Sequence, residues 1–139
     1  MDFIGLVRDL DAELAKRDGN EHAFYHQFNK IDQVHHVILA YLDGKAVGCG
    51  GLKQFDGQTM EIKRMFVLPL HRGKGIASMI LEGLEEWAAE LSFRRFILET
   101  GKRQPEAIAL YFRNGYRIIP NYGQYLGIAN SVCFEKLGI

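Results

Sequence analysis

The stretch LPLHRGKGIASMIL, residues 68–81, joins a glycine-rich turn to the start of an apolar helical pattern. Arg72 precedes Gly73 and Gly75, and Lys74 stands between the two glycines. The first amide groups of a helix are unpaired donors that bind anions, and glycine lets a phosphate approach the backbone closely. The pattern therefore predicts a phosphate-binding turn, with a tight turn that carries two solvated basic side chains as the alternative.

Two familiar phosphate-binding motifs fit this stretch poorly. The P-loop requires G-x-x-x-x-G-K-[ST], a string that the sequence lacks. A dinucleotide-binding G-x-G-x-x-G could begin at Gly73, with Glu99 near the offset of a ribose-binding acid, but Ser78 stands at the third glycine position. That fold also needs several consecutive βα units, whereas strand-like segments precede the turn and only two βα steps follow it. Neither motif is favoured.

The composition indicates a single globular domain over residues 1–139. Its 17 basic and 17 acidic residues cancel, so no basic surplus favours nucleic acid. Apolar runs such as VILAYL are far shorter than the ~20 residues of a membrane span, and the N-terminus lacks the basic start of a signal peptide. We therefore expect a cytoplasmic protein without a nucleic-acid or membrane partner.

The residues that most often bind metals are sparse. Cys49 and Cys133 lie in separate apolar, strand-like stretches, where a free cysteine behaves as a small buried hydrophobic residue; a disulfide or a catalytic role is the alternative. His22 and His26 are spaced i, i+4, but no H-E-x-x-H motif or third ligand accompanies them. We expect no metal cofactor.

The hydrophobic pattern predicts an α/β (α+β) domain with a mixed sheet of about six strands and about four flanking helices. Turns at Gly44-Lys45 and Asp56-Gly57 make the first three strands an antiparallel meander, and a strand, a helix and a strand then form one parallel βαβ crossover. In chain order we expect helices over 2–18 and 21–29, strands over 35–43, 46–55 and 58–68, a helix over 76–91, a strand over 94–100, a helix over 105–114, and strands over 116–119 and 131–136.

Two motifs with the correct elements between them carry a family resemblance. Arg72 to Ala77 reads R-x-x-G-x-A after a strand that ends Met65-Phe66-Val67, and Ala107 to Tyr116 reads A-x-x-L-Y-x-x-x-G-Y. Residues 35–136 thereby resemble the GNAT N-acetyltransferase superfamily. The resemblance implies the GNAT fold, with its usual first strand lost or trimmed in this chain, and acetyl-CoA as a cosubstrate.

The resemblance also assigns the coenzyme site. The amides of residues 73–77 would wrap the pyrophosphate while Arg72 and Lys74 add charge. The pantetheine arm would bond to the edge of Met65 to Val67, where a bulge separates this strand from its parallel neighbour. Gln104 stands where the family often has an asparagine that touches pantetheine. The expected coenzyme-binding residues are Met65, Phe66, Val67, Arg72, Gly73, Lys74, Gly75, Ile76, Ala77, Gln104 and Tyr111.

The chemistry of acetyl transfer requires a base and an acid. An alkylamine is almost wholly charged at pH 7 and must lose a proton before it attacks. By resemblance Glu61 is the general base, directly or through water; an ion pair with a cross-strand lysine or arginine is the alternative. Backbone amides near Met65 and Phe66 would stabilise the oxyanion. Tyr111 would protonate the leaving thiolate, with plain core packing as the alternative.

The acceptor is less well specified. By resemblance its pocket is built from the early helices and the loop before the last strand, which supply Tyr25, Asn29, Tyr122 and Tyr125. These side chains could line a small aromatic pocket, or the tyrosines could simply pack the loop. Lys63 and Arg64 form an unusual basic pair beside Glu61, and an acceptor carboxylate bound by one of them is a hypothesis that favours an amino-acid-like substrate.

We therefore expect an N-acetyltransferase that moves the acetyl group of acetyl-CoA directly to the primary amine of a small molecule. A non-catalytic acyl-CoA-binding module and a protein N-acetyltransferase are the alternatives. The acceptor amine is the expected partner, and a homodimer is left open.

Overall fold

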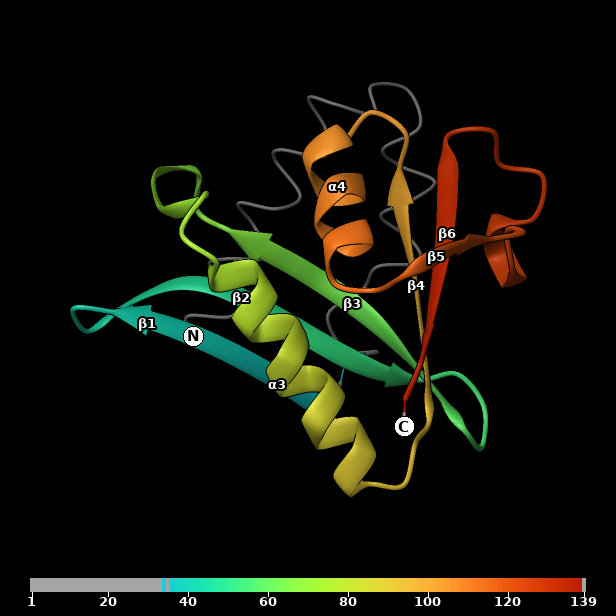
Figure 1. Ribbon diagram of the computed structural model, residues 1–139, viewed down its shortest axis with the longest axis horizontal. Helices are drawn as coiled ribbons and strands as arrows, with labels where there is room; N and C mark the ends of the chain where they lie inside the picture. The colour runs from blue at the N-terminus through green and yellow to red at the C-terminus, as the bar shows by residue number, and fades with distance from the viewer. Residues whose placement is uncertain (1–33, 35, 139) are drawn as a thin grey trace.

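The computed structural model describes Val34 and residues 36–138. In chain order they form β1 (His36–Leu42), β2 (Lys45–Gln54), β3 (Thr59–Val67), η3 (Pro69–His71), α3 (Ile76–Glu90), β4 (Arg95–Gly101), α4 (Pro105–Arg113), β5 (Arg117–Ile119), η4 (Gly123–Tyr125) and β6 (Ser131–Leu137), where η marks a 3₁₀-helix. The strands build one mixed sheet in the order β1-β2-β3-β4-β6-β5 (Figure 1). The helices expected over 2–18 and 21–29, and with them Tyr25, Asn29 and the two histidines, lie outside the described residues.

The first three strands form the predicted antiparallel meander. Their first turn lies one residue earlier than Gly44-Lys45, because Lys45 already pairs with Leu42 as the first residue of β2. Asp43 and Gly44 form the turn with φ angles of 53° and 77°. A two-residue hairpin turn of this kind needs two left-handed residues, and aspartate and glycine adopt that conformation more readily than lysine.

The parallel crossover of β3, α3 and β4 is also confirmed, and its two strands separate early. The pairing covers only Thr59 to Glu61 of β3 and Arg95 to Ile97 of β4. Beyond it the register between β3 and β2 shifts, and Arg64 has a left-handed φ of 61°. This irregularity is the bulge expected at Met65 to Val67, placed one residue earlier. The end of β3 therefore keeps its ladder with β2 and not with β4.

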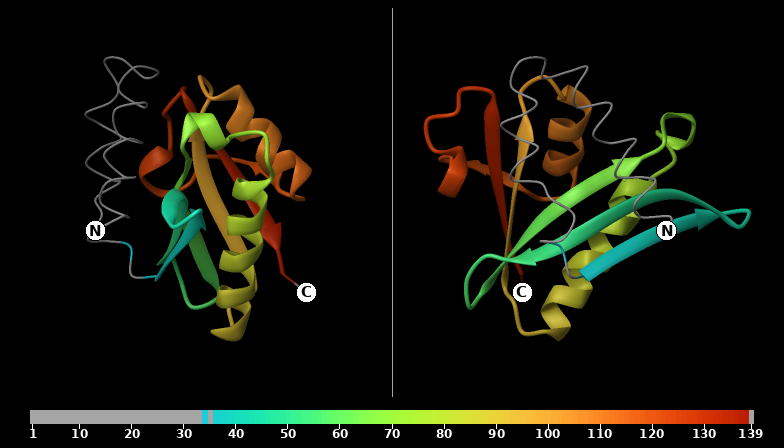
Figure 2. Two further views of the ribbon diagram at one scale, coloured as in Figure 1. Left: turned by 90° about the vertical axis from the view of Figure 1, so that its left-hand side faces the viewer. Right: turned by 180° about the vertical axis from the view of Figure 1, so that it is seen from behind.

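Both α-helices of the described part of the chain cover one face of the sheet, as the edge-on view in Figure 2 shows. The buried side of α3 consists of Ile80, Leu81, Leu84 and Ala88, which form one helical stripe over the main core. Met79, part of the apolar pattern in the sequence, is instead 70% exposed. Each residue turns a helix by about 100°, which carries Met79 off the stripe centred on Ile80 and Leu84.

The opposite face is covered at one end by the segment that contains η4 (Figure 2). Tyr125 packs there against Cys133 in a separate cluster that includes Tyr122. Side chains alternate along β6, so Cys133 faces away from Val132 and Phe134, which contact the main core. The loop before the last strand thus lies across the sheet from α4.

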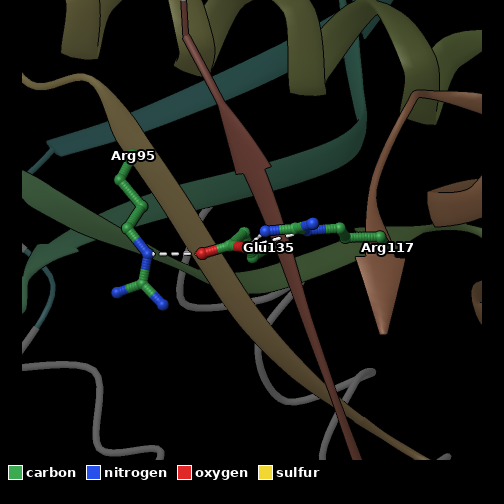
Figure 3. Close-up of polar contacts among 3 residues, drawn as sticks. All are labelled: Arg95, Arg117 and Glu135. Carbon is green, nitrogen blue, oxygen red and sulfur yellow. Dashed lines mark hydrogen bonds and ion pairs between the residues drawn. The ribbon is translucent and has the colours of Figure 1, made fainter. Parts of the chain in front are cut away.

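Glu135 of β6 connects the last three strands of the sheet. Its Oε1 accepts a hydrogen bond from Arg95 Nε at 2.7 Å, and its Oε2 accepts one from Arg117 Nε at 2.9 Å (Figure 3). Arg95 belongs to β4 and Arg117 to β5. Hydrogen bonds from these two guanidinium groups, Arg95 first, lower the pKa of Glu135.

The two cysteines are free and buried, as the sequence predicts. Burial raises the pKa of the Cys49 thiol to about 12 and that of the Cys133 thiol to about 11. Within the described residues, no helix has the length and apolar character to cross a membrane. The same part of the chain holds no group of three or more His, Cys, Asp or Glu side chains placed to bind a metal.

Candidate active site

The glycine-rich turn leads directly into α3. Gly73 and Gly75 have left-handed φ angles of 79° and 80°, and Gly75 is the N-cap of the helix. The cap has no side-chain hydrogen bond, and the first turn of α3 has no acidic residue. A Cβ atom at either glycine would meet nothing within 4 Å, so backbone conformation and not packing requires glycine here. The positive end of the helix dipole is therefore left available to an anion.

A pocket of about 400 Å³ lies between the end of β3, this turn, the first turn of α3 and one side of α4. Figure 1 shows these elements around one region of the sheet. Every expected coenzyme-binding residue except Lys74 lines it: Met65, Phe66, Val67, Arg72, Gly73, Gly75, Ile76, Ala77, Gln104 and Tyr111. Lys74 is exposed and outside this lining.

The lining also includes side chains that were not predicted from the sequence. Glu106, Leu110 and Arg113 lie on the pocket side of α4, and Ser78 lies in the first turn of α3. The three α4 residues are spaced i, i+4, i+7 and so share one helical face. This spacing around the motif residue Leu110 is the signal that could have identified Glu106 and Arg113.

Arg72 is held against the end of β3. Its Nε donates a hydrogen bond to the Val67 carbonyl at 2.8 Å, and its guanidinium carbon lies 5.4 Å from the centre of the Phe66 ring. Both contacts join the turn to the strand edge that lines the pocket. Arg72 therefore fixes the shape of the pocket, and its expected charge contribution to a bound pyrophosphate stays a prediction.

Asn114 ties the two helical walls of the pocket together. It is the C-cap of α4, and its Nδ2 donates to the Leu110 carbonyl at 2.9 Å and to Ser78 Oγ at 3.1 Å. Ser78 belongs to the first turn of α3. These bonds set the separation of the helices across the pocket, and no feature of the sequence indicates this role for either residue.

Tyr111 combines the two roles that the sequence left as alternatives. It is 6% exposed and packs against Tyr116 and Phe134, with ring centres 5.8 Å and 5.7 Å away, yet it also lines the pocket. Burial, and then the charge of Glu99, raises the pKa of Tyr111. Its hydroxyl therefore stays protonated at neutral pH and can act as a proton donor.

Glu61 lies on the other face of the sheet, because it alternates along β3 with the core residues Met60 and Ile62. The Tyr122 hydroxyl donates a hydrogen bond to Glu61 Oε2 at 2.7 Å, and Lys63 Nζ lies 3.8 Å from the same oxygen. Glu61 thus forms the ion pair that was expected as the alternative to its role as a base. Its partner, Lys63, lies on the same strand and not on a neighbouring one.

Lys63 and Tyr125 extend this polar cluster. Lys63 Nζ donates to the Tyr125 hydroxyl at 3.2 Å. Burial lowers the pKa of Lys63, and the charges of Glu61 and Glu99 oppose that shift. Tyr125 is 1% exposed, so it packs the loop, as the alternative reading proposed. Tyr122 is half-buried and therefore more accessible to an acceptor than Tyr125.

Arg64 occupies the bulge itself. The Arg64 carbonyl accepts a hydrogen bond from the Cys49 thiol at 3.2 Å, and Arg64 is 6% exposed. Its charge lowers the pKa of Cys49 against the larger effect of burial. The contact of Arg64 with an acceptor stays a prediction.

The sequence pattern of the Acetyltransferase (GNAT) family matches residues 6–116, most of the chain. The chain belongs to the GNAT acetyltransferase family. The family recognised from the two motifs is thereby confirmed, and so is the GNAT fold over the described residues.

Two curated relatives of the chain are named as acetyltransferases. An IAA acetyltransferase of Azospirillum brasilense is 37% identical over 100 residues, which are 71% of this chain and 65% of that protein. An aminoalkylphosphonate N-acetyltransferase of Salmonella typhimurium is 33% identical over 118 residues, 80% of this chain and 77% of that protein. The chain thus spans only about two thirds of the length of the first of these relatives.

Solved GNAT structures share the same architecture. An acyl-CoA N-acyltransferase structure from Klebsiella pneumoniae has a TM-score of 0.80 at 31% identity and covers 99% of this chain and 90% of that one. A GNAT acetyltransferase from Elizabethkingia anophelis, solved with acetyl-CoA bound, has a TM-score of 0.68 at 19% identity and covers 89% and 87% of the two chains. The second similarity shows the fold alone.

Proposed function

We propose that this GNAT protein transfers the acetyl group of acetyl-CoA to the primary amine of a small molecule by direct attack. The observation that carries the proposal is the gathering of ten expected coenzyme-binding residues around one pocket, next to the strand that bears Glu61. A family whose members are named as acetyltransferases supports the same reaction.

The residues present fit acetyl-CoA. Unpaired amides at the start of α3 suit the pyrophosphate, and the two left-handed glycines expose them. The edge of Met65 to Val67 that faces β4 has no ladder with that strand, so apart from the Val67 carbonyl, which accepts a hydrogen bond from Arg72, its backbone is open to the peptide-like pantetheine arm. The bound coenzyme supplies the thioester carbonyl that the amine attacks.

Glu61 is the proposed general base. The acceptor reaches the site as an ammonium ion, and its proton must leave before the nitrogen can attack. Tyr122 donates a hydrogen bond to Glu61 Oε2 and so orients the carboxylate, while Lys63 neutralises part of its charge. The other carboxylate oxygen, or a water bound to it, would accept the proton.

The other two charges that develop in the reaction, on the oxyanion and on the leaving thiolate, form on the coenzyme. Backbone amides beside the bulge, near Met65 and Phe66, are proposed to stabilise the oxyanion of the tetrahedral intermediate. The thiolate that leaves takes its proton from the buried hydroxyl of Tyr111, which lines the pocket. The raised pKa keeps this hydroxyl protonated at neutral pH, and the tyrosinate left after the transfer regains a proton from water before the next cycle.

We also propose that the acceptor carries an acidic group. Lys63 Nζ lies 3.8 Å from Glu61 Oε2, Arg64 follows Lys63 in the sequence, and the Salmonella relative is named for an aminoalkylphosphonate, an amine with an anionic group. Arg64→Ala and Lys63→Met should each raise the acceptor KM about tenfold. An unchanged acceptor KM in both variants would contradict this part of the proposal.

The test of the reaction itself measures free thiol released from acetyl-CoA with a panel of small amines. Glu61→Gln and Tyr111→Phe should each lower kcat about 100-fold or more, as the loss of a general base or acid does. The dissociation constant for coenzyme A should stay within about twofold for both, because Glu61 is outside the pocket lining and phenylalanine keeps the ring with which Tyr111 lines it. Glu90→Gln, which removes an exposed carboxylate of α3, is the matched control.

The panel also separates the alternative functions. Coenzyme A binding without thiol release for any amine would indicate an acyl-CoA-binding module. Release with a peptide and not with small amines would indicate a protein N-acetyltransferase.

A further inference from the structure

The proposed transfer needs a path between the two faces of the sheet. The coenzyme pocket, with Tyr111, lies on the face covered by α3 and α4, whereas Glu61 points to the opposite face. β3 and β4 are paired only as far as Glu61 and Ile97. An acceptor nitrogen that meets both Glu61 and the thioester must therefore lie beside the residues of β4 that follow Ile97.

Glu99 occupies this position. It stands two residues after Ile97, which pairs with Glu61, so all three side chains point to the same face. The Ser131 hydroxyl of β6 donates to Glu99 Oε2 at 2.7 Å and fixes the carboxylate. Glu99 is half-buried and so keeps accessible surface, whereas Glu61 is 3% exposed.

The charge of Glu99 acts on groups from both faces. After burial, it is the main cause of the raised pKa values of Tyr111, in the pocket, and Tyr125, on the opposite face. It also favours the charged form of Lys63. The charge of Glu99 therefore influences groups on both faces of the sheet, as expected of a carboxylate on a strand between them.

Resting on the proposed function, we propose that Glu99 is an acceptor-binding residue that holds the ammonium group of the amine while Glu61 removes its proton. A carboxylate fixed by Ser131 binds a cation through a charge-assisted hydrogen bond and gains little from an uncharged amine. Glu99 therefore makes the enzyme select alkylamines, which are cationic at neutral pH, over arylamines, which are not.

The experiment compares Glu99→Gln with the wild-type protein on benzylamine, a cation at pH 7.5, and aniline, which is uncharged there. The variant should lower kcat/KM for benzylamine about tenfold or more and leave the value for aniline within about twofold. Glu99→Asp keeps the charge and should recover part of the preference for benzylamine. Glu90→Gln is the control, since its carboxylate is exposed on α3.

Ser131→Ala keeps the charge but removes the hydroxyl that fixes it, and covers the case in which Glu99→Gln fails to fold. It should lower kcat/KM about threefold for benzylamine alone. An equal loss for both amines, or no loss for either, in whichever variant folds would overturn the assignment of Glu99. Failure of the wild-type protein to acetylate any amine would instead contradict the proposed function, so the two failures are distinguishable.

Discussion

The Tyr122 hydroxyl donates a hydrogen bond of 2.7 Å to Glu61 Oε2 across 61 positions of sequence. This bond joins the loop before the last strand to the central strand of the proposed site. A carboxylate that is 3% exposed depends strongly on such donors, because water cannot replace them. The loop that carries Tyr122 is thus linked to Glu61, the proposed base, and a substitution at Tyr122 should alter the function of Glu61.

Tyr122→Phe removes only this donor. The free energy of unfolding should fall by about 1.5 to 3 kcal/mol, as for a hydrogen bond to a charged group. The kcat/KM for the amine should fall by about three- to tenfold while the KM for acetyl-CoA is unchanged. Urea unfolding and steady-state kinetics measure the two effects. Glu90→Gln, at an exposed carboxylate of α3, is the control and should change neither.

Gly73→Ala and Gly75→Ala test the turn. Each places a Cβ on a left-handed residue and should cost about 1 to 2 kcal/mol of stability, although no atom lies within 4 Å to clash. Because the strain shifts the amides at the start of α3, the dissociation constant for coenzyme A should rise about three- to tenfold. Calorimetric titration measures it.

Gly57→Ala is the matched control for these turn variants. Gly57 also has open space at its Cβ position but is not left-handed, so stability and coenzyme binding should stay as in the wild type. If Gly75→Ala bound coenzyme A as tightly as Gly57→Ala, the turn would not be the pyrophosphate site.

Much of the coenzyme side could be predicted because local sequence determines it. The glycines between Arg72 and Ala77 fix the turn, and the helical spacing from Ala107 to Tyr111 fixes which side of α4 faces the pocket. Asn114 and Ser78, which join the two walls, could not be predicted, because their bond depends on how α3 and α4 pack.

The acceptor side was harder to predict because its contacts are distant in sequence. Alternation along β3 puts Glu61 and Lys63 on one face, a signal present in the sequence. Which partners meet them depends on the path of the loop with Tyr122 and Tyr125. In the sequence, Glu99 is notable only as a candidate ribose-binding acid. Its place near Glu61 depends on where β3 and β4 separate, and its contact with Ser131 depends on the pairing of β4 with β6.

Glu135 predicts how stability depends on pH in the C-terminal strands. Its pKa is lowered in the folded protein, so its contribution is complete above the unfolded value of about 4.3 and is lost as the pH falls through the folded value. Glu135→Gln should therefore destabilise the protein by about 1 to 2 kcal/mol at pH 7.

The difference between Glu135→Gln and the wild type should stay constant from about pH 6 to 8 and shrink below about pH 4.3. Urea unfolding across this range measures it. A difference that grew on acidification would contradict the contacts with Arg95 and Arg117.

The two cysteines should be unreactive in the folded protein. Burial raises the pKa of Cys49 to about 12 and that of Cys133 to about 11, so almost no thiolate forms at pH 8. Mass spectrometry after treatment with iodoacetamide should find no label on the native protein and two labels in urea. Rapid labelling of the native protein at the rate of a free cysteine would show that one of the thiols is accessible.

We infer that the pocket and Glu61 together transfer acetyl groups to a small amine. The most direct measurement follows thiol release and acetylated amine together, by absorbance and mass spectrometry, for the wild type and Tyr111→Phe. The wild type should release thiol and acetylated amine in equal amounts, and Tyr111→Phe should lower turnover about 100-fold with coenzyme binding intact. Thiol release without an acetylated amine, or full turnover in Tyr111→Phe, would contradict it.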